Sequence, residues 1–137
     1  MSQSQPVICD VVAGLFVRDG QLLLGYRINT EHHADTWGLP AGRSEPGEDA
    51  ATAIVREMRE ELGIEYVAPL TPHIQCVGPT GRVYAAYVIE RWSGNLHNAE
   101  PHLCRELTWH PLGALPEPVT PATEVILGTW QAQQAQQ

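Results

Sequence analysis

The chain contains no lysine, because all eight of its basic residues are arginine. This absence excludes catalysis through a lysine Schiff base and excludes a phosphate-binding loop that depends on a lysine. Arginine remains, and its planar guanidinium suits forked contacts with phosphate oxygens. The chain therefore keeps the means to bind an anionic ligand, through arginine alone.

Long apolar runs are also missing. No stretch approaches the roughly 18 consecutive apolar residues of a membrane-spanning helix, and residues 1–6 lack the apolar segment of a secretion signal. The three cysteines, Cys9, Cys76 and Cys104, form neither a close pair nor a metal-binding spacing, which predicts reduced thiols. Together these absences predict a cytoplasmic protein with no membrane partner.

Positive charge is scarce, and the net charge at pH 7 is −8. Binding to a nucleic-acid backbone needs a basic patch that displaces counterions, so the charge argues against a nucleic-acid partner. The length of 137 residues and the apolar content of 43% fit a single domain over residues 1–137. A homodimer stays open, since the apolar run at residues 83–89 fits either a core strand or an interface.

Carboxylates are concentrated between Gly42 and Ile64, where a glycine-rich turn leads into a predicted helix. Glu57, Glu60 and Glu61 share one helix face, because residues three and four apart are neighbours. Their repulsion costs about 0.2–0.5 kcal/mol per exposed pair unless a cation binds. Mg²⁺ takes carboxylate and phosphate oxygens, so the pattern predicts a metal site for a polyphosphate. The alternative is an acidic face exposed to solvent.

An apolar stripe on the same predicted helix favours the metal site over the solvated face. Ala51, Val55, Met58 and Leu62 recur at helical spacing and are expected to pack on the core, with the glutamates facing outward. Gly63 supplies the stop signal at the end of the helix.

From Gly42 to Ile64 the sequence resembles the Nudix box, written G-x5-E-x7-R-E-U-x-E-E-x-G-U, with U a bulky aliphatic residue. Every specified position is matched. Residues 22–27 and 37–42 are similar to the strand and the approach that precede the box in this family. The resemblance implies hydrolysis of a nucleoside diphosphate linked to another group, with Mg²⁺ or Mn²⁺ and water.

The resemblance also implies a set of metal ligands. Glu60 and Glu61 are expected to bind the metal, and Glu57 is expected as a further ligand or as the base. The backbone carbonyl of Ala41 is a candidate ligand. Glu100 resembles an acidic loop residue that some relatives add as a metal contact, and a solvated loop carboxylate is the alternative.

Other positions of the box are expected to support these ligands. Arg56 and Glu48 resemble an ion pair that locks the turn onto the helix, with Arg56 counted among the catalytic residues. Gly42 and Gly47 are expected to permit backbone angles that a Cβ forbids, so that the turn approaches the metal closely. Gly63 completes this supporting set.

The substrate is read outside the box. Arg27 resembles a basic residue that MutT-like members place against a phosphate, and a surface ion pair is the alternative. Residues 100–109 resemble small MutT-like pyrophosphatases, which implies a (deoxy)nucleoside triphosphate giving monophosphate and pyrophosphate. Pro79 resembles a residue of ADP-ribose pyrophosphatases. A dinucleoside polyphosphate, or a regulator that binds nucleotides without hydrolysis, completes the alternatives.

Periodicity and turn signals predict the remaining elements. Strand-like runs at residues 7–17 and 21–26 are joined by Asp19-Gly20, a strong hairpin signal. Further strands are expected at residues 74–77, 82–92 and 106–110, and a helix capped by Thr120 at residues 121–130, followed by a frayed tail at 131–137. Strands interrupted by one helix and followed by another predict a mixed sheet between helices. This agrees with the α/β/α sandwich that the resemblance to the Nudix family implies.

Overall fold

The computed structural model describes residues 5–136, so residues 1–4 of the polar N-terminal segment and residue 137 of the predicted tail lie outside it. Strands β1 (Val11–Arg18) and β2 (Gln21–Arg27) form the predicted hairpin. Asp19 and Gly20 both have positive φ, 52° and 74°, as the mirror-image turns of tight hairpins require. The hairpin prediction is confirmed.

Strand β1 organises the sheet, because it pairs with three other strands. It runs parallel to β6 (Val83–Ile89) and antiparallel to β2 and to β4 (Ala41–Arg43). Strand β6 carries β5 (Ile74–Val77), and β2 carries β3 (Trp37–Gly38) and β7 (Cys104–Pro111). The parallel pair between β1 and β6 makes the sheet mixed, as predicted.

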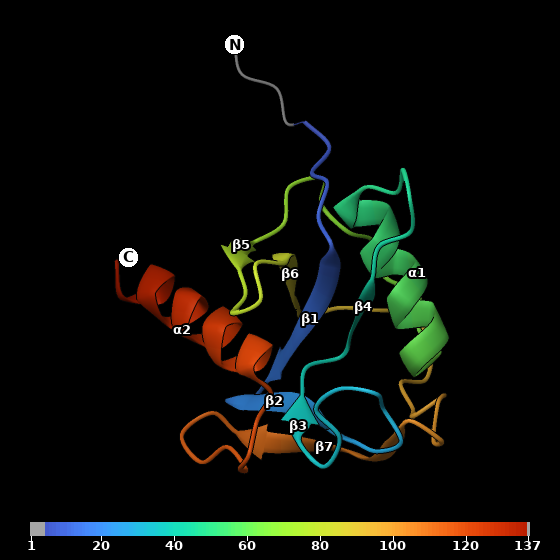
Figure 1. Ribbon diagram of the computed structural model, residues 1–137, viewed down its shortest axis with the longest axis vertical. Helices are drawn as coiled ribbons and strands as arrows, with labels where there is room; N and C mark the ends of the chain where they lie inside the picture. The colour runs from blue at the N-terminus through green and yellow to red at the C-terminus, as the bar shows by residue number, and fades with distance from the viewer. Residues whose placement is uncertain (1–4, 137) are drawn as a thin grey trace.

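Two helices flank this sheet (Figure 1). Helix α1 (Ala50–Leu62) lies on one side, and α2 (Pro121–Ala135) lies on the other side near β5. Each helix covers its own buried apolar cluster, one around Phe16 and Met58 and the other around Leu15 and Ile126. This arrangement confirms the predicted mixed sheet between helices.

Several details differ from the sequence predictions. The strand expected at residues 7–17 begins only at Val11, and the strand expected at residues 82–92 ends at Ile89. Strands β3 and β4 were not expected, because each is too short to show a period and each forms by pairing with a distant strand. The buried face of α1 is turned relative to the predicted stripe: Ala50, Ala53, Ile54, Met58 and Leu62 are buried, whereas Ala51 and Val55 are only half-buried. This rotation brings Glu57 to the edge of the core instead of the outer face.

Helix α2 begins as predicted, with Thr120 as its N-cap and Pro121 in its first turn. It ends at Ala135 and not at Trp130, so the predicted frayed tail is helical over residues 131–135. Glutamine and alanine both have high helix propensity, which explains the extension. Over residues 5–136, no helix has both the length and the apolar character to cross a membrane.

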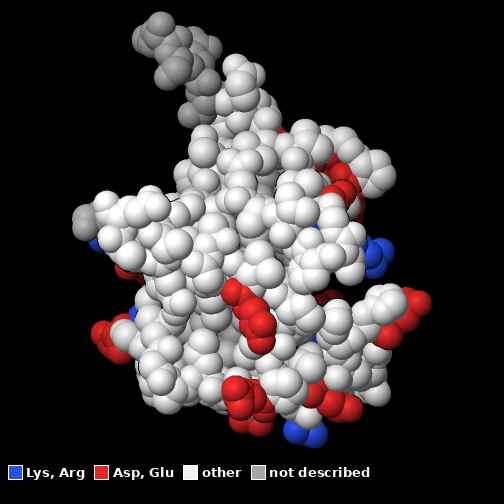
Figure 2. Space-filling model, turned by 60° about the vertical axis from the view of Figure 1, so that its left-hand side comes forward, with Lys and Arg blue, Asp and Glu red and all other residues white. Residues whose placement is uncertain are grey.

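Acidic side chains dominate the charged surface. Figure 2 shows a face on which acidic groups lie at several places, while basic groups are fewer and show less of their surface. The distribution agrees with the net charge of −8.

Candidate functional site

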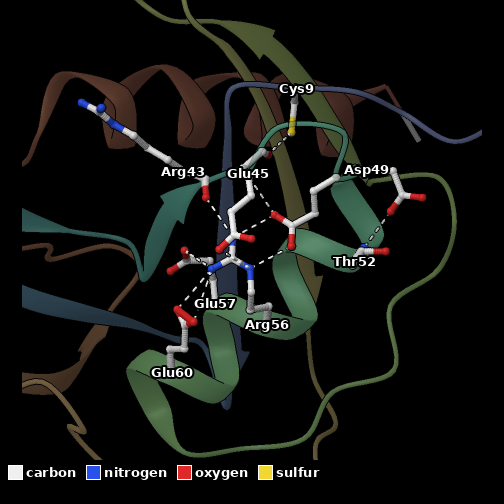
Figure 3. A network of polar contacts seen from close by, with 10 residues as sticks. Cys9, Arg43, Glu45, Asp49, Thr52, Arg56, Glu57 and Glu60 are labelled. Atoms are coloured by element: carbon white, nitrogen blue, oxygen red, sulfur yellow. Dashed lines mark hydrogen bonds and ion pairs between the residues drawn. The ribbon is translucent and has the colours of Figure 1, made fainter.

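Arg56 of α1 binds two parts of the chain together (Figure 3). Its Nε and Nη2 atoms donate to the two carboxylate oxygens of Glu48, each at 2.8 Å, and Nη2 also donates to the Arg43 carbonyl at 3.0 Å. This is the ion pair expected from the sequence. The guanidinium lowers the pKa of Glu48, and Glu48 in turn raises the pKa of Arg56. The turn before α1 is thereby fastened to the helix.

The same guanidinium also contacts two glutamates of the helix. Its Nη1 atom donates to Glu57 at 2.9 Å and to Glu60 at 3.1 Å. Glu60 therefore lies against Arg56 with its side chain 52% exposed, whereas the Glu57 side chain is only 12% exposed. Among the described residues, no three acidic, histidine or cysteine side chains converge as a group of metal ligands. The predicted meeting of three carboxylates is thus reduced to two, because Arg56 attracts Glu60.

Those two are Glu57 and Glu61, whose carboxyl groups lie close enough to shift each other's pKa. Burial raises the pKa of Glu57, although Glu61 and Arg56 oppose the rise through hydrogen bonds. Burial raises the pKa of Glu61 well above its usual value, and the charges of Glu57 and Glu100 add to that rise. Glu57 is buried and Glu61 is half-buried. Two neighbouring carboxyl groups with raised pKa values form an electrostatic environment that a bound cation would relieve.

The backbone of β4 approaches this pair closely. The Pro40 carbonyl accepts from Gly14 of β1, so the alternation of an antiparallel ladder turns the amide and carbonyl of Ala41 to the opposite edge. On that edge the Ala41 amide lies close enough to Glu61 to oppose the rise in the pKa of its carboxyl group. Carboxylate and carbonyl oxygens at one place are the donor set that Mg²⁺ or Mn²⁺ prefers, so the residues present fit a divalent cation.

The glycines of the turn have separate reasons for lacking a side chain. A Cβ on Gly42 would overlap the Glu57 carboxylate, whereas Gly47 has open space around it and a φ of +80°. Gly63 needs both, since it caps α1 at a φ of 68° and packs against the His97 ring. The expectation of special backbone angles therefore fits Gly47 and Gly63, and close approach is what Gly42 provides.

Two adjoining cavities flank the segment that connects β3 and β4. The first, of about 230 Å³, contains the Glu61 and Glu100 side chains. The second, of about 310 Å³, has apolar side chains of β1 and α2 in its lining. Its charged lining residues are one glutamate, Glu31, and three arginines, Arg27, Arg43 and Arg82. The two cavities share a wall formed by Arg27, Thr30, Gly38, Leu39 and Ala41. One lobe is therefore acidic and its neighbour is basic.

Arg27 lies between the two lobes, but part of its guanidinium is already engaged. Its Nε donates to the His33 carbonyl at 3.2 Å, and its Nη2 donates to the His32 carbonyl at 3.0 Å. These bonds hold the loop between β2 and β3. Arginine has five N–H donors, so further donors remain for a phosphate. Within residues 5–136, Arg27 forms no ion pair, which was the alternative to a phosphate contact.

Sequence reasoning missed Arg43, Arg82 and Asn98 as site residues. Arg43 directly follows Gly42, and Arg82 follows the turn before β6, so neither belongs to a recognisable local pattern. The small number of basic residues could have indicated them, because three of the eight arginines in the chain line one cavity. Asn98 lies in the loop before β7 and lines the acidic lobe.

Comparison with known proteins gives consistent matches. A model of the NUDIX domain family matches residues 9–127. The CTP pyrophosphohydrolase of Escherichia coli strain K12 is 34% identical over 134 residues, 92% of this chain and 93% of that protein. The 8-oxo-dGTP diphosphatase of Haemophilus influenzae is 31% identical over 90 residues, 64% of this chain and 66% of that protein. The structure of the MutT NUDIX hydrolase from Burkholderia pseudomallei has a TM-score of 0.74 and 32% identity, covering 91% of this chain and 98% of that one.

The contact between Glu48 and Arg56 generates a stability prediction. Glu48→Gln should lower the free energy of unfolding at pH 7 by about 2 kcal/mol, the contribution of a hydrogen-bonded charge that is shielded from water. Because the pKa of Glu48 is lowered by folding, its contribution is complete above its ordinary value of 4.5 and is lost as the pH falls through the folded-state pKa. Urea denaturation at several pH values should show the two proteins converging in acid.

The matched control is Glu65→Gln, because Glu65 makes the same forked contact with Arg59 at 2.8 Å. That pair is exposed to solvent, with the Glu65 side chain 61% exposed compared with 9% for Glu48. Its loss should therefore change stability much less. Equal losses in the two variants, or a wild-type advantage over Glu48→Gln that persists unchanged in acid, would contradict this account.

Proposed function

This chain belongs to the NUDIX family of hydrolases, which act on phosphoric anhydrides of nucleotides, and we propose that it cleaves a (deoxy)nucleoside triphosphate to a monophosphate and pyrophosphate. The observation that carries the proposal is the pairing of an acidic lobe with a basic lobe across one wall. A metal-bound pyrophosphate fits the acidic lobe. The basic lobe, with an apolar floor, fits a nucleoside and its remaining phosphate charge.

The residues that would hold Mg²⁺ or Mn²⁺ are Glu57, Glu60, Glu61 and Glu100, with the carbonyl of Ala41. Glu57, Glu61 and Ala41 already lie together. Glu60 would need to leave Arg56, and its exposed side chain leaves it free to do so. When bound, such a cation neutralises phosphate oxygens and lowers the pKa of a bound water.

The chain's own groups then have distinct tasks. A water oxygen attacks the α or the β phosphorus, and the P–O bond that bridges these two phosphorus atoms breaks. The leaving group takes the electron pair of that bond; it is pyrophosphate after attack at the α position and the nucleoside monophosphate after attack at the β position. The proton from the water goes to a glutamate carboxylate, for which we propose Glu57, because Arg56 orients it at 2.9 Å. Arg27 binds a phosphate oxygen through the donors that the loop carbonyls leave free.

The relatives support a small nucleotide as the substrate. Two proteins that match this chain are named for CTP and for 8-oxo-dGTP, both triphosphates. The clustered acidic groups of Figure 2 support a small ligand over a polynucleotide, because long phosphate backbones bind through extended basic patches. The basic lobe, of about 310 Å³, has the size of a small-ligand pocket.

A substrate panel tests the proposed reaction. Purified protein should release pyrophosphate from CTP, dCTP or 8-oxo-dGTP in the presence of Mg²⁺ or Mn²⁺, and release should stop with a chelator. Products are measured by ion-exchange chromatography. AMP formed from ADP-ribose alone, or cleavage of dinucleoside polyphosphates alone, would replace the triphosphate assignment. Nucleotide binding without turnover of any compound would identify a non-catalytic regulator instead.

Neutralising the buried pair should separate catalysis from folding. Glu57→Gln and Glu61→Gln should each lower kcat by about 10²–10⁴-fold, the range for loss of general acid–base groups. Stability at pH 7 should be kept or raised, because folding already disfavours the charged form of both groups. Steady-state kinetics and thermal melting check the two expectations. A well-folded Glu61→Gln protein with full activity would rule out the catalytic assignment.

The two glycines of the turn predict opposite phenotypes. Gly42→Ala should displace the Glu57 carboxylate, which is the movable end of a side chain, and so lower kcat about 10²-fold while leaving the melting temperature nearly unchanged. Gly47→Ala should lower stability, because alanine is strained at a φ of +80°, and should retain most of its activity. Thermal melting and steady-state kinetics of both variants test this difference. A Gly42→Ala protein that is less stable than wild type but has the wild-type kcat would contradict it.

A further inference from the structure

The loop between β6 and β7 is closed by a single side chain, that of Asn98. Its Nδ2 donates to the Cys104 carbonyl at 2.6 Å, and its Oδ1 accepts from the Glu100 amide at 3.2 Å. The Glu100 carbonyl in turn accepts from the amides of Leu103 and Cys104, at 2.9 and 3.1 Å. Asn98 therefore encloses Glu100 within a small hydrogen-bonded ring.

Both neighbours of Asn98 are bonded to the end of α1. The His97 amide donates to the Leu62 carbonyl and the Ala99 amide donates to the Glu61 carbonyl, each at 3.0 Å. These carbonyls belong to the last turn of the helix, where carbonyl groups have no N–H partner within the helix. The loop thus takes its position from the helix that carries Glu61.

The opposite side of the loop is held more lightly. The Ile28 amide donates to the Leu103 carbonyl at 3.0 Å, and the exposed Asn29 side chain donates to the His102 carbonyl at 3.1 Å. Neither contact involves Asn98 or Glu100. They fasten the far part of the loop to the segment after β2.

Asparagine suits position 98 because the site needs a donor and an acceptor at once. An aspartate would place two oxygens against each other at Cys104, and serine is too short to offer both groups. Asn98, Glu100 and Glu61 line the same acidic lobe. The Glu100 carboxylate can keep one position only if the loop that carries it is held in place. The hydrogen-bonded ring around Glu100 therefore fixes where its carboxylate lies relative to Glu61.

We propose that Asn98 is a positioning residue that fixes the Glu100 carboxylate beside Glu61 and thereby sets the affinity of the acidic lobe for a divalent cation. This inference rests on the proposed function, because it takes the lobe to be a cation site. It assigns to Asn98 no contact with substrate. Its effect passes entirely through Glu100, which makes it open to a double-mutant cycle.

The test measures Mn²⁺ binding directly, by electron paramagnetic resonance of free Mn²⁺, alongside steady-state kinetics. Asn98→Ala should weaken Mn²⁺ binding about tenfold, as is typical when a residue that orients a metal ligand is removed. Glu100→Gln should weaken binding by at least as much. In the Glu100→Gln background, Asn98→Ala should have less than a further twofold effect, because the group that it positions is already lost.

Two further variants guard against a merely structural explanation. Asn29→Gly removes the other side-chain bond to the loop, and glycine accepts the φ of 54° at that position, so Mn²⁺ binding should stay within twofold of wild type. Asn98→Ser keeps an acceptor for the Glu100 amide and should give an intermediate affinity. Thermal melting establishes that each variant is folded.

The outcomes separate the inference from the proposed function. If the wild type binds Mn²⁺ and cleaves nucleotides but Asn98→Ala or Glu100→Gln binds Mn²⁺ normally, the role of Asn98 is wrong and the proposed function stands. The role of Asn98 would also be wrong if the losses of Mn²⁺ affinity in the two single variants multiplied in the double variant. Asn98 would then act on Mn²⁺ binding by a route other than Glu100. A folded wild type that neither binds Mn²⁺ nor cleaves any nucleotide would overturn both.

Discussion

The guanidinium of Arg56 lies between carboxylates from two parts of the chain, Glu48 in the turn and Glu57 and Glu60 on the helix. Without a cation at this point, the charges gathered by the turn and the helix would repel one another. Arg56 therefore lets the turn lie close to α1. Breaking such a shielded contact leaves unpaired charge behind, which is why so much of the site depends on one side chain.

The close approach of turn and helix is useful only because the sheet delivers the turn to the right place. Strand β1 pairs with β4 at one end and with β2 at the other, so one strand connects the box to the hairpin. The wall between the two cavities continues directly from β3 into β4. The acidic and basic lobes are thus adjacent as a direct result of strand pairing.

Local features of the fold were predictable from the sequence, and features made by distant contacts were not. The hairpin at Asp19 and Gly20, the start of α2 and the family follow from signals confined to a few consecutive residues. Strands β3 and β4 owe their existence to partners elsewhere in the chain.

The candidate site divides in the same way. The box indicated which glutamates to examine, but helical spacing places side chains only to within a face. The orientation of Glu60 depends on Arg56, and the engagement of Arg27 depends on two histidine carbonyls. The Asn98 side chain bonds the Glu100 amide and the Cys104 carbonyl, and no sequence periodicity reveals this ring.

The wall shared by the two cavities limits how such a protein can diversify. Leu39 in that wall is buried, and its amide donates to the Thr123 hydroxyl of α2 at 3.2 Å, so the wall is tied to the helix behind it. A substitution there would disturb the acidic lobe and the basic lobe together. Arg43 and Arg82 line only the basic lobe of the two, and the acidic lobe does not depend on them. Evolution toward new ligands is therefore expected to change Arg43 and Arg82 and to preserve the wall between the two cavities.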